Sequence, residues 1–322
     1  MSGVSNNEKP LVTLALFAYN QSGYVREAIE GALAQDYSPL EIVLSDDCST
    51  DDTFEIMQQA AQNYRGPHTI VLNRNPKNLN MGGHVNRIGE LARGQLVVAA
   101  AGDDISLPNR TTRLVAAWQA AGAPSAVLYS DFVAVDQNSA PVDLGNEVGY
   151  PGPHSLEDMA KGAVDVLGAA TAMTSDLFTN FPLLSPTIRH EDRVLPFRAL
   201  LVGGEVLYVD EKLVRYRAVG GISRNLPKTL REYLSVYTPS IANRTLPDAL
   251  QRLSDALYAK PNDLRLRYMC ESTIADHESR LAFNASSHWA YEAVLFQWIF
   301  RGARKLPLFK HYLKMRFSSA FH

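Results

Sequence analysis

The chain has 322 residues, of which 46% are hydrophobic and 20% charged, and its formal net charge of −3 gives no reason to expect a nucleic-acid partner. No run approaches the roughly 20 apolar residues that span a membrane, and segment 1–10 lacks the apolar core of a secretory signal. With two cysteines, far apart and in no metal-ligand spacing, the composition predicts a globular cytoplasmic protein of one large domain, or of one domain and an annex.

The first hundred residues alternate between strand-like and helical patterns. Short apolar runs predict strands at 11–18, 40–44, 69–72 and 96–101. Helical spacing and capping residues predict helices at 24–34, at about 53–61 and at 84–92. Apolar strands that alternate with helices are typical of an α/β fold in which helices cover a parallel sheet. Ligands of such sheets bind beyond the carboxyl ends of the strands.

Pairs of adjacent carboxylates close two of these predicted strands. Asp46-Asp47 follows the run 40–44, and Asp103-Asp104 follows the run 96–101. Neighbouring ionised carboxylates repel each other unless a cation lies nearby, and Mg²⁺ and Mn²⁺ prefer oxygen ligands that they often share with phosphates. The pairs therefore predict a metal–diphosphate site at one edge of the sheet. A solvated turn or a helix cap is the alternative interpretation.

Three motifs of other nucleotide-binding or hydrolytic folds are absent from the sequence. It contains no G-x-G-x-x-G after the first predicted strand, no G-x-x-x-x-G-K-[ST] and no G-x-S-x-G. These absences argue against a dinucleotide dehydrogenase, a P-loop protein and an α/β-hydrolase. A diphosphate bound here must rely on a metal and on scattered side chains.

The second half of the chain first becomes rich in turn residues and then helical. Residues 131–165 contain many Pro, Gly and Asn and predict loops that bind an acceptor. The elements expected after them are a strand at 169–173, a helix at 191–201, strands at 206–209 and 213–217, and helices at 229–236, 248–258 and 263–283. We therefore expect two parts, 1–225 and 226–322.

The last thirty residues combine basic and aromatic side chains. No acidic residue follows Glu292. Such a tail can lie on an anionic membrane surface, and packing on the first part of the chain or in a homodimer interface is the alternative.

Four segments of the sequence resemble family 2 glycosyltransferases of the GT-A fold. They are 12–20, ending in Ala-Tyr-Asn; 41–53, reading E-I-V-L-S-D-D-C-S-T-D-D-T; 78–104, ending in Gly-Asp-Asp; and 190–198, reading H-E-D-R-V-L-P-F-R. The resemblance covers roughly residues 10–225 and implies a Rossmann-like, mostly parallel sheet flanked by helices, with a C-terminal helical extension. It also implies an inverting, metal-dependent enzyme that moves a sugar from a nucleoside diphosphate sugar, UDP- or dTDP-linked, to an acceptor hydroxyl in cell-surface glycan or O-antigen assembly.

The resemblance implies a role for each matching residue. Asp47 would accept the N3–H of uracil or thymine, Asp104 would bind Mg²⁺ or Mn²⁺ on the diphosphate, and Asp103 would face the ribose or the metal's ligand shell. The other implied contacts of the nucleotide sugar are Ala18, Tyr19, Asn20, Asn78, Gly82, Gly83, Arg215 and Arg217. Segment 215–217 and the glycines after it are expected to form a mobile basic segment that closes on the diphosphate, or else a solvated surface loop.

By the same resemblance Asp192 is the expected catalytic base. It would deprotonate the acceptor hydroxyl, which then attacks the anomeric carbon from the face opposite the diphosphate. Glu191 is its competitor, and because side chains of adjacent residues usually diverge, we expect only one of them to face the site. His190 is interpreted as a hydrogen-bonding neighbour. Alternatively, the two acids only open a helix, whose dipole favours them there.

The sequence departs from the family pattern at Ala101, where a first metal-binding Asp often stands. It also lacks the Q-x-x-R-W motif of processive synthases, so we expect single additions to a glycan or lipid-linked acceptor, with the protein peripheral on the inner face of the plasma membrane if its tail binds lipid. Two other interpretations stay open. One is a nucleotide-sugar-binding or scaffold protein without turnover. The other is a sugar-1-phosphate nucleotidyltransferase, whose Gly-rich, basic first loop is absent here.

Overall fold

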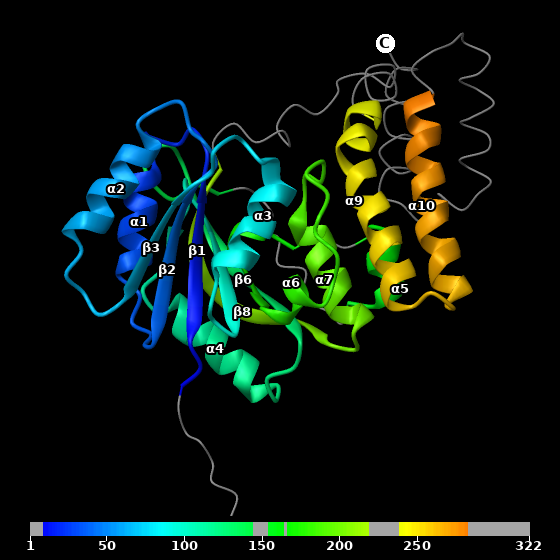
Figure 1. Ribbon diagram of the computed structural model, residues 1–322, viewed down its shortest axis with the longest axis horizontal. Helices are drawn as coiled ribbons and strands as arrows, with labels where there is room; N and C mark the ends of the chain where they lie inside the picture. The colour runs from blue at the N-terminus through cyan, green and yellow to red at the C-terminus, as the bar shows by residue number, and fades with distance from the viewer. Residues whose placement is uncertain (1–8, 144–153, 164–165, 219–237, 283–322) are drawn as a thin grey trace, which may run out of the picture.

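A curled sheet forms the centre of the computed structural model, which describes residues 9–143, 154–163, 166–218 and 238–282 (Figure 1). Within these residues the sheet has eight strands in the order β3-β2-β1-β4-β7-β6-β8-β5. The strands are β1 (Val12–Ala18), β2 (Leu40–Asp46), β3 (Thr69–Arg74), β4 (Leu96–Ala101), β5 (Ile105–Ser106), β6 (Ala126–Val135), β7 (Thr171–Thr174) and β8 (Glu205–Arg217).

The first four strands run parallel to one another, which confirms the predicted core of the sheet. β1 lies between β2 and β4, and β3 pairs with β2. β7 then pairs antiparallel with β4 and with β6, whereas β8 runs parallel to β6. The carboxyl ends of β1, β2 and β4 consequently meet at one edge, where Ala18 is paired with Asp46 and Phe17 with Ala101.

Helices cover both faces of the sheet because alternate residues of its strands point to opposite sides. Leu14 and Val98 pack with α1 (Val25–Leu33), α2 (Thr53–Asn63) and α4 (Arg110–Ala120) on one face. Ala15 and Val97 pack with α3 (Asn80–Leu91), α6 (Asp176–Thr179) and α7 (Glu191–Leu201) on the other. The described elements therefore form helix, sheet and helix layers, as predicted from the alternation of strands and helices.

The C-terminal helices extend the layer that contains α7. α9 (Thr238–Ala259) and α10 (Leu264–Ala282) lie side by side in Figure 1, next to α5 (Leu156–Ala160). Phe197 of α7 packs in one buried cluster with Ala256 of α9 and Leu266 of α10. A helical extension is thus confirmed, whereas the helix predicted at 229–236, the boundary near 225 and the tail 283–322 lie outside the described residues. Among the described helices, none is both long and apolar enough to cross a membrane.

Three predicted elements differ from the observed ones. The helix expected from residue 84 begins at Asn80, and part of the expected acceptor loop is strand β6. The two strands expected at 206–209 and 213–217 are one strand, β8, because it continues along β6 through a register shift at Ser130 and Asp131. Arg215 and Arg217 accordingly lie in a strand, and the prediction that they belong to a mobile segment was wrong. The glycine-rich residues 220–224 lie outside the described part of the chain.

Candidate active site

Both acidic pairs lie at the carboxyl end of β1. The backbone N–H of Asp47 donates to the carbonyl of Ala18 at 2.9 Å, and that of Gly102 donates to the carbonyl of Phe17 at 2.8 Å. The loops that follow β2 and β4 are therefore fixed to consecutive residues of one strand end. The structure brings together the acidic pairs that the sequence placed at separate strand ends.

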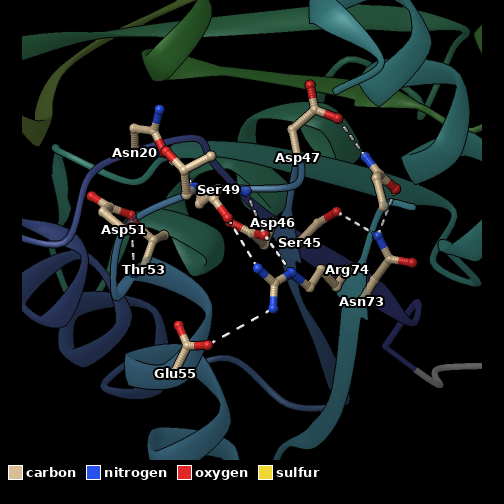
Figure 2. A network of polar contacts seen from close by, with 12 residues as sticks. Asn20, Ser45, Asp46, Asp47, Ser49, Asp51, Thr53, Glu55, Asn73 and Arg74 are labelled. Carbon is tan, nitrogen blue, oxygen red and sulfur yellow. Dashed lines mark hydrogen bonds and ion pairs between the residues drawn. The ribbon is translucent and has the colours of Figure 1, made fainter. Parts of the chain in front are cut away.

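The two carboxylates of the first pair have different surroundings (Figure 2). Asp46 is fully buried and accepts from the backbone N–H of Ser49 at 3.0 Å, and the Nε of Arg74 lies 3.5 Å from it. It closes the turn that contains Cys48, whose φ is +62°. Asp46 therefore shapes the loop, whereas Asp47 points away from it in Figure 2, and a contact of the buried Asp47 with a ligand stays a prediction.

A chain of polar side chains orients Asp47. Its Oδ1 accepts from the Nδ2 of Asn75 and from the backbone N–H of Leu79, both at 2.8 Å. The Nδ2 of Asn73 in turn donates to the Oδ1 of Asn75 at 3.0 Å and to the Oγ of Ser45 (Figure 2). These two asparagines were not among the predicted site residues, although their position at the end of the third apolar run indicated them.

The Ala-Tyr-Asn segment is joined to the loop after β2. The Oδ1 of Asn20 accepts a hydrogen bond from the backbone N–H of Thr50 at 2.8 Å, and the backbone N–H of Asn20 donates to the Oγ of Ser49 at 2.9 Å. Its φ of +53° is one that asparagine tolerates. Of the three predicted contacts, Ala18 is buried and Asn20 holds the loop, so Tyr19, whose side chain is exposed, presents the largest free surface.

Asn78, Gly82 and Gly83 lie at the start of α3. Asn78 is exposed and accepts from the backbone N–H of Asn80 at 2.8 Å. A Cβ at position 82 would lie 2.0 Å from the carbonyl oxygen of Ser185, so the close approach that needs this glycine is to protein backbone. A Cβ at position 83 would lie 2.9 Å from that of Leu79. The contact of these residues with a nucleotide stays a prediction.

The second acidic pair, Asp103 and Asp104, has raised pKa values. Burial raises the pKa of Asp104 to about 7, and the adjacent charge of Asp103 adds to this effect. Burial likewise raises the pKa of Asp103. No group of three or more His, Cys, Asp and Glu side chains in the described residues could hold a metal by itself. Mg²⁺ characteristically needs only one or two carboxylates when water and substrate phosphates complete its shell, and these two carboxylates fit that use.

Arg217 holds the Gly102-Asp103-Asp104 turn in place. Its backbone N–H donates to Oδ1 of Asp104 at 2.7 Å, and its Nε donates to the carbonyl of Asp103 at 2.9 Å. The remaining guanidinium N–H groups donate to the carbonyls of Asp136 and Gln137, to Oε2 of Glu27 and to the Oγ of Ser139. Since all five donors of the side chain are engaged, it is a support for the acidic turn rather than a free phosphate ligand.

A second buried arginine, Arg110, lies close to the same turn and was not among the predicted site residues. The Nη2 of Arg110 donates to the carbonyls of Ala99, Ala169 and Thr171 at 2.7, 2.9 and 3.2 Å. These bonds tie β4 to the residues before and within β7. Burial lowers the pKa of Arg110 to about 10, and the negative charge of Asp104 opposes that shift.

Asp192 and Glu191 both face the 3₁₀ turn η1 (Gly168–Ala170). Asp192 Oδ2 accepts from the backbone N–H of Gly168 at 3.1 Å. A Cβ on Gly168 would lie 2.4 Å from Oε1 of Glu191 and 3.3 Å from Oδ2 of Asp192. Both acids therefore lie close to Gly168, and the expectation that only one of them faces a substrate stays a prediction. Burial raises the pKa of Glu191 to about 7.

Tyr216 of β8 has a raised pKa. Burial raises it, and the negative charges of Asp104, Asp103 and Asp192 raise it further. These charges come from the turn after β4 and from the first turn of α7. Tyr216 was not among the predicted site residues.

The residues that lead into α7, just before Asp192, are held by a buried residue of the C-terminal helices. Oδ1 of Asp248, in α9, accepts from the backbone N–H groups of Arg189 and His190 at 2.9 and 3.2 Å. Its Oδ2 is hydrogen-bonded to Nδ1 of His190 at 2.7 Å. Because Asp248 is fully buried and follows His190 by 58 residues, no local sequence pattern indicated this contact.

Comparison with known proteins agrees with this geometry. Residues 13–158 match the model of glycosyl transferase family 2. TuaG of Bacillus subtilis (strain 168), named for teichuronic acid biosynthesis, is 26% identical over 72% of this chain and 88% of its own. Two further curated relatives are 34% and 37% identical, and the chain spans only 39% and 36% of their lengths.

Solved structures share the architecture. S. aureus TarS in complex with UDP-GlcNAc has a TM-score of 0.51 and 18% identity, over 84% of this chain and 81% of that one. The mannosyltransferase PcManGT from Pyrobaculum calidifontis, in complex with GDP-Man and Mn²⁺, has a TM-score of 0.54 and 17% identity, over 96% and 84%. At these identities the likeness concerns the fold, which is the GT-A fold. Residues 13–158, somewhat less than half of the chain, are therefore similar to glycosyl transferase family 2, and they begin a sheet with the fold of these solved structures.

Proposed function

We propose that this protein is an inverting, metal-dependent glycosyltransferase that moves a sugar from a nucleoside diphosphate sugar to an acceptor hydroxyl in polysaccharide assembly. The observation that carries the proposal is that both acidic pairs meet at the carboxyl end of β1, while Asp192 is hydrogen-bonded to the η1 turn, which Arg110 ties to β4. The match to the family model supports the reaction class, and a relative named for teichuronic acid biosynthesis supports the polysaccharide context.

The residues divide the chemistry between two ends of the donor. Asp104, with Asp103 beside it, would hold Mg²⁺ or Mn²⁺, which supplies Lewis-acid stabilisation of the leaving diphosphate. PcManGT, of the same fold, is known in complex with Mn²⁺, which supports this assignment. Asp192 would accept the proton of the attacking hydroxyl, and its hydrogen bond from Gly168 orients the carboxylate for that transfer.

Asp47 would recognise the base of the nucleotide. One carboxylate oxygen is already engaged by Asn75 and Leu79, which fixes the direction of the group. A carboxylate suits the N3–H of uracil or thymine, so we expect a UDP- or dTDP-linked donor. The bound UDP-GlcNAc of TarS is consistent with this choice, and GDP is the alternative that PcManGT illustrates.

The acceptor would be a glycan or a lipid-linked saccharide. The C-terminal tail, with its basic and aromatic residues, would place the enzyme on the inner face of a membrane or join two copies. A lipid vesicle sedimentation assay with and without anionic lipid distinguishes these two roles of the tail.

Hydrolysis of the donor tests the proposal without a known acceptor, since water can replace the acceptor hydroxyl. We expect release of the nucleoside diphosphate that depends on Mn²⁺ or Mg²⁺, and loss of this release in Asp192→Asn with donor binding retained. Asp210→Asn, an exposed carboxylate of β8, is the control and should behave as the wild type. The configuration of the released sugar, read by NMR, reports inversion. Donor binding without any turnover in the wild type would instead indicate a binding or scaffold protein.

A further inference from the structure

The segment 182–190 joins α6 to α7 as irregular backbone and ends shortly before the proposed base, Asp192. Its residues Leu184 and Ile188 are buried in the cluster that packs α3 and α7 on the sheet. Backbone N–H and C=O groups that leave water need partners, and this segment has no neighbouring strand to supply them. The side chains that take the place of such a strand therefore decide where α7 begins.

Asn86, in the middle of α3, pairs with both polar backbone groups of one residue of this segment. Its Nδ2 donates to the carbonyl of Leu184 at 2.8 Å, and its Oδ1 accepts from the backbone N–H of Leu184 at 2.9 Å. A side-chain amide offers donor and acceptor in one plane, as a strand residue does. The two bonds therefore fix both the position and the direction of the backbone at Leu184.

Neighbouring contacts hold the rest of the segment. The backbone N–H of Ser185 donates to Oε1 of Gln251, in α9, at 2.8 Å. The carbonyl oxygen of Ser185 lies close against α3, where a Cβ on Gly82 would be 2.0 Å from it. Asp248 of α9 accepts from the last two backbone N–H groups of the segment. Side chains of α3 thus hold its beginning, and side chains of α9 hold its end.

We propose that Asn86 is a positioning residue for the proposed base, an inference that rests on the proposed function. It would act through the segment 182–190 on the first turn of α7, where Asp192 accepts from the backbone N–H of Gly168. The contact of α3 with Asp47 is separate, because Leu79 makes it at the start of the helix, about two turns before Asn86. Loss of the two bonds to Leu184 should therefore displace the base and leave nucleotide recognition in place.

Asn86→Leu tests this role, since it replaces the amide by an apolar group of similar shape. Hydrolysis by the full chain with Mn²⁺ measures kcat, with the donor that the wild type hydrolyses fastest among UDP-glucose, UDP-N-acetylglucosamine, dTDP-glucose and GDP-mannose. We expect kcat to fall about 10- to 100-fold, because a displacement of about 1 Å can cost that much. The affinity for the matching nucleoside diphosphate, measured by calorimetry, should stay within about threefold of the wild type.

Thr13→Val is the matched control. Thr13 is fully buried at the amino end of β1, and its Oγ1 donates to Oε1 of Glu41 at 2.8 Å and accepts from the backbone N–H of Gly94 at 2.9 Å. This variant also loses one donated and one accepted hydrogen bond, so the melting temperature of both variants should fall by several degrees. Because Thr13 lies at the sheet edge opposite the candidate site, its variant should keep the kcat of the wild type.

Asn86→Asp keeps an acceptor for the N–H of Leu184 but offers no donor to its carbonyl, so kcat should fall here too, and this variant serves where Asn86→Leu does not fold. An unchanged kcat in the Asn86 variants, an equal loss of kcat in Thr13→Val, or a loss of nucleotide affinity as large as that of kcat would overturn the positioning role and leave the proposed function intact. Failure of the wild type to hydrolyse any of the four donors with Mn²⁺ or Mg²⁺ would overturn the proposed function and the positioning role with it.

Discussion

Replacement of Asp248 by alanine should impair catalysis more than its effect on stability explains. The variant would leave two backbone N–H groups, of Arg189 and His190, and the His190 ring without their buried acceptor. An unsatisfied buried donor costs about 1–3 kcal/mol, and because the loop is only partly buried we expect a loss of about 2–4 kcal/mol in the free energy of unfolding.

The catalytic effect follows from the position of the loop. His190 precedes Asp192 by two residues, so a loop released from Asp248 lets the proposed base shift relative to the acceptor hydroxyl. A displacement of about 1 Å lowers kcat by about 100-fold, whereas donor binding, which involves Asp47 and the acidic turn, should change little. Initial rates of donor hydrolysis at saturating donor measure kcat, and chemical denaturation measures stability.

Asp255→Ala supplies the matched control. Asp255 is also fully buried in α9, and it accepts from Nε and Nη2 of Arg198 at 2.7 and 3.0 Å. Breaking a buried ion pair typically costs about 3–5 kcal/mol, so this variant should lose at least as much stability. Its bonds are to Arg198, six residues beyond the proposed base in α7, and not to Arg189 or His190, so its kcat should fall much less than that of Asp248→Ala when both are assayed well below their melting temperatures. Equal losses of kcat in the two variants, or an unchanged kcat in Asp248→Ala, would show that Asp248 does not position the base.

Three further predictions concern pH, packing and the metal. Burial raises the pKa of Glu191 from 4.5 to about 7, so the folded state binds more protons between these values and the free energy of unfolding should fall as pH rises through this range. Metal-free urea denaturation at pH 5 and pH 8 measures this fall, and Glu191→Gln should reduce it by about 2–3 kcal/mol. The same fall in the wild type and in the variant would contradict the assignment. Gly82→Ala should destabilise by about 1–3 kcal/mol because its Cβ would overlap the carbonyl of Ser185, and an unchanged melting curve would show that α3 can shift. Arg217→Met should weaken Mn²⁺ binding in the presence of UDP about 10- to 100-fold by loosening the turn that carries Asp104, and calorimetry that finds wild-type affinity would refute this role.

The parts of the fold that the sequence predicted are those encoded by local patterns. Leu14, Ile42 and Val98 lie in short apolar runs, and each became a buried strand of the parallel core. The acidic pairs could be placed at one edge because a parallel sheet aligns the carboxyl ends of its strands. β8 was divided in two because Asp210-Glu211 resembles a turn, although pairing with β6 keeps that segment extended.

Long-range contacts account for what local patterns missed. Arg217 looked like a free cation in a basic segment, but its partners come from residues 27, 103 and 136–139. Asp248 looked like an ordinary polar position of a helix, and only the packing of α9 against α7 brings it to His190. The side chains of Arg217 and Asp248 hold in place the backbone next to a proposed site carboxylate. The sequence separation between such a supporting residue and the residue that it supports is not fixed, so no sequence motif reveals it.

The position of the C-terminal helices bears on how the site works. Asp248 of α9 holds the residues just before the proposed base. Two helical turns further along α9, Asp255 is bonded to Arg198 of α7. The acidic turn, by contrast, is held by Arg217 of β8, and the strand before it is held by Arg110 of α4. The two halves of the proposed chemistry therefore have separate supports, so substitution of Asp248 should act on proton transfer, while substitutions around Arg217 should act on the metal and donor. That separation allows each half of the site to be tested without disturbing the other.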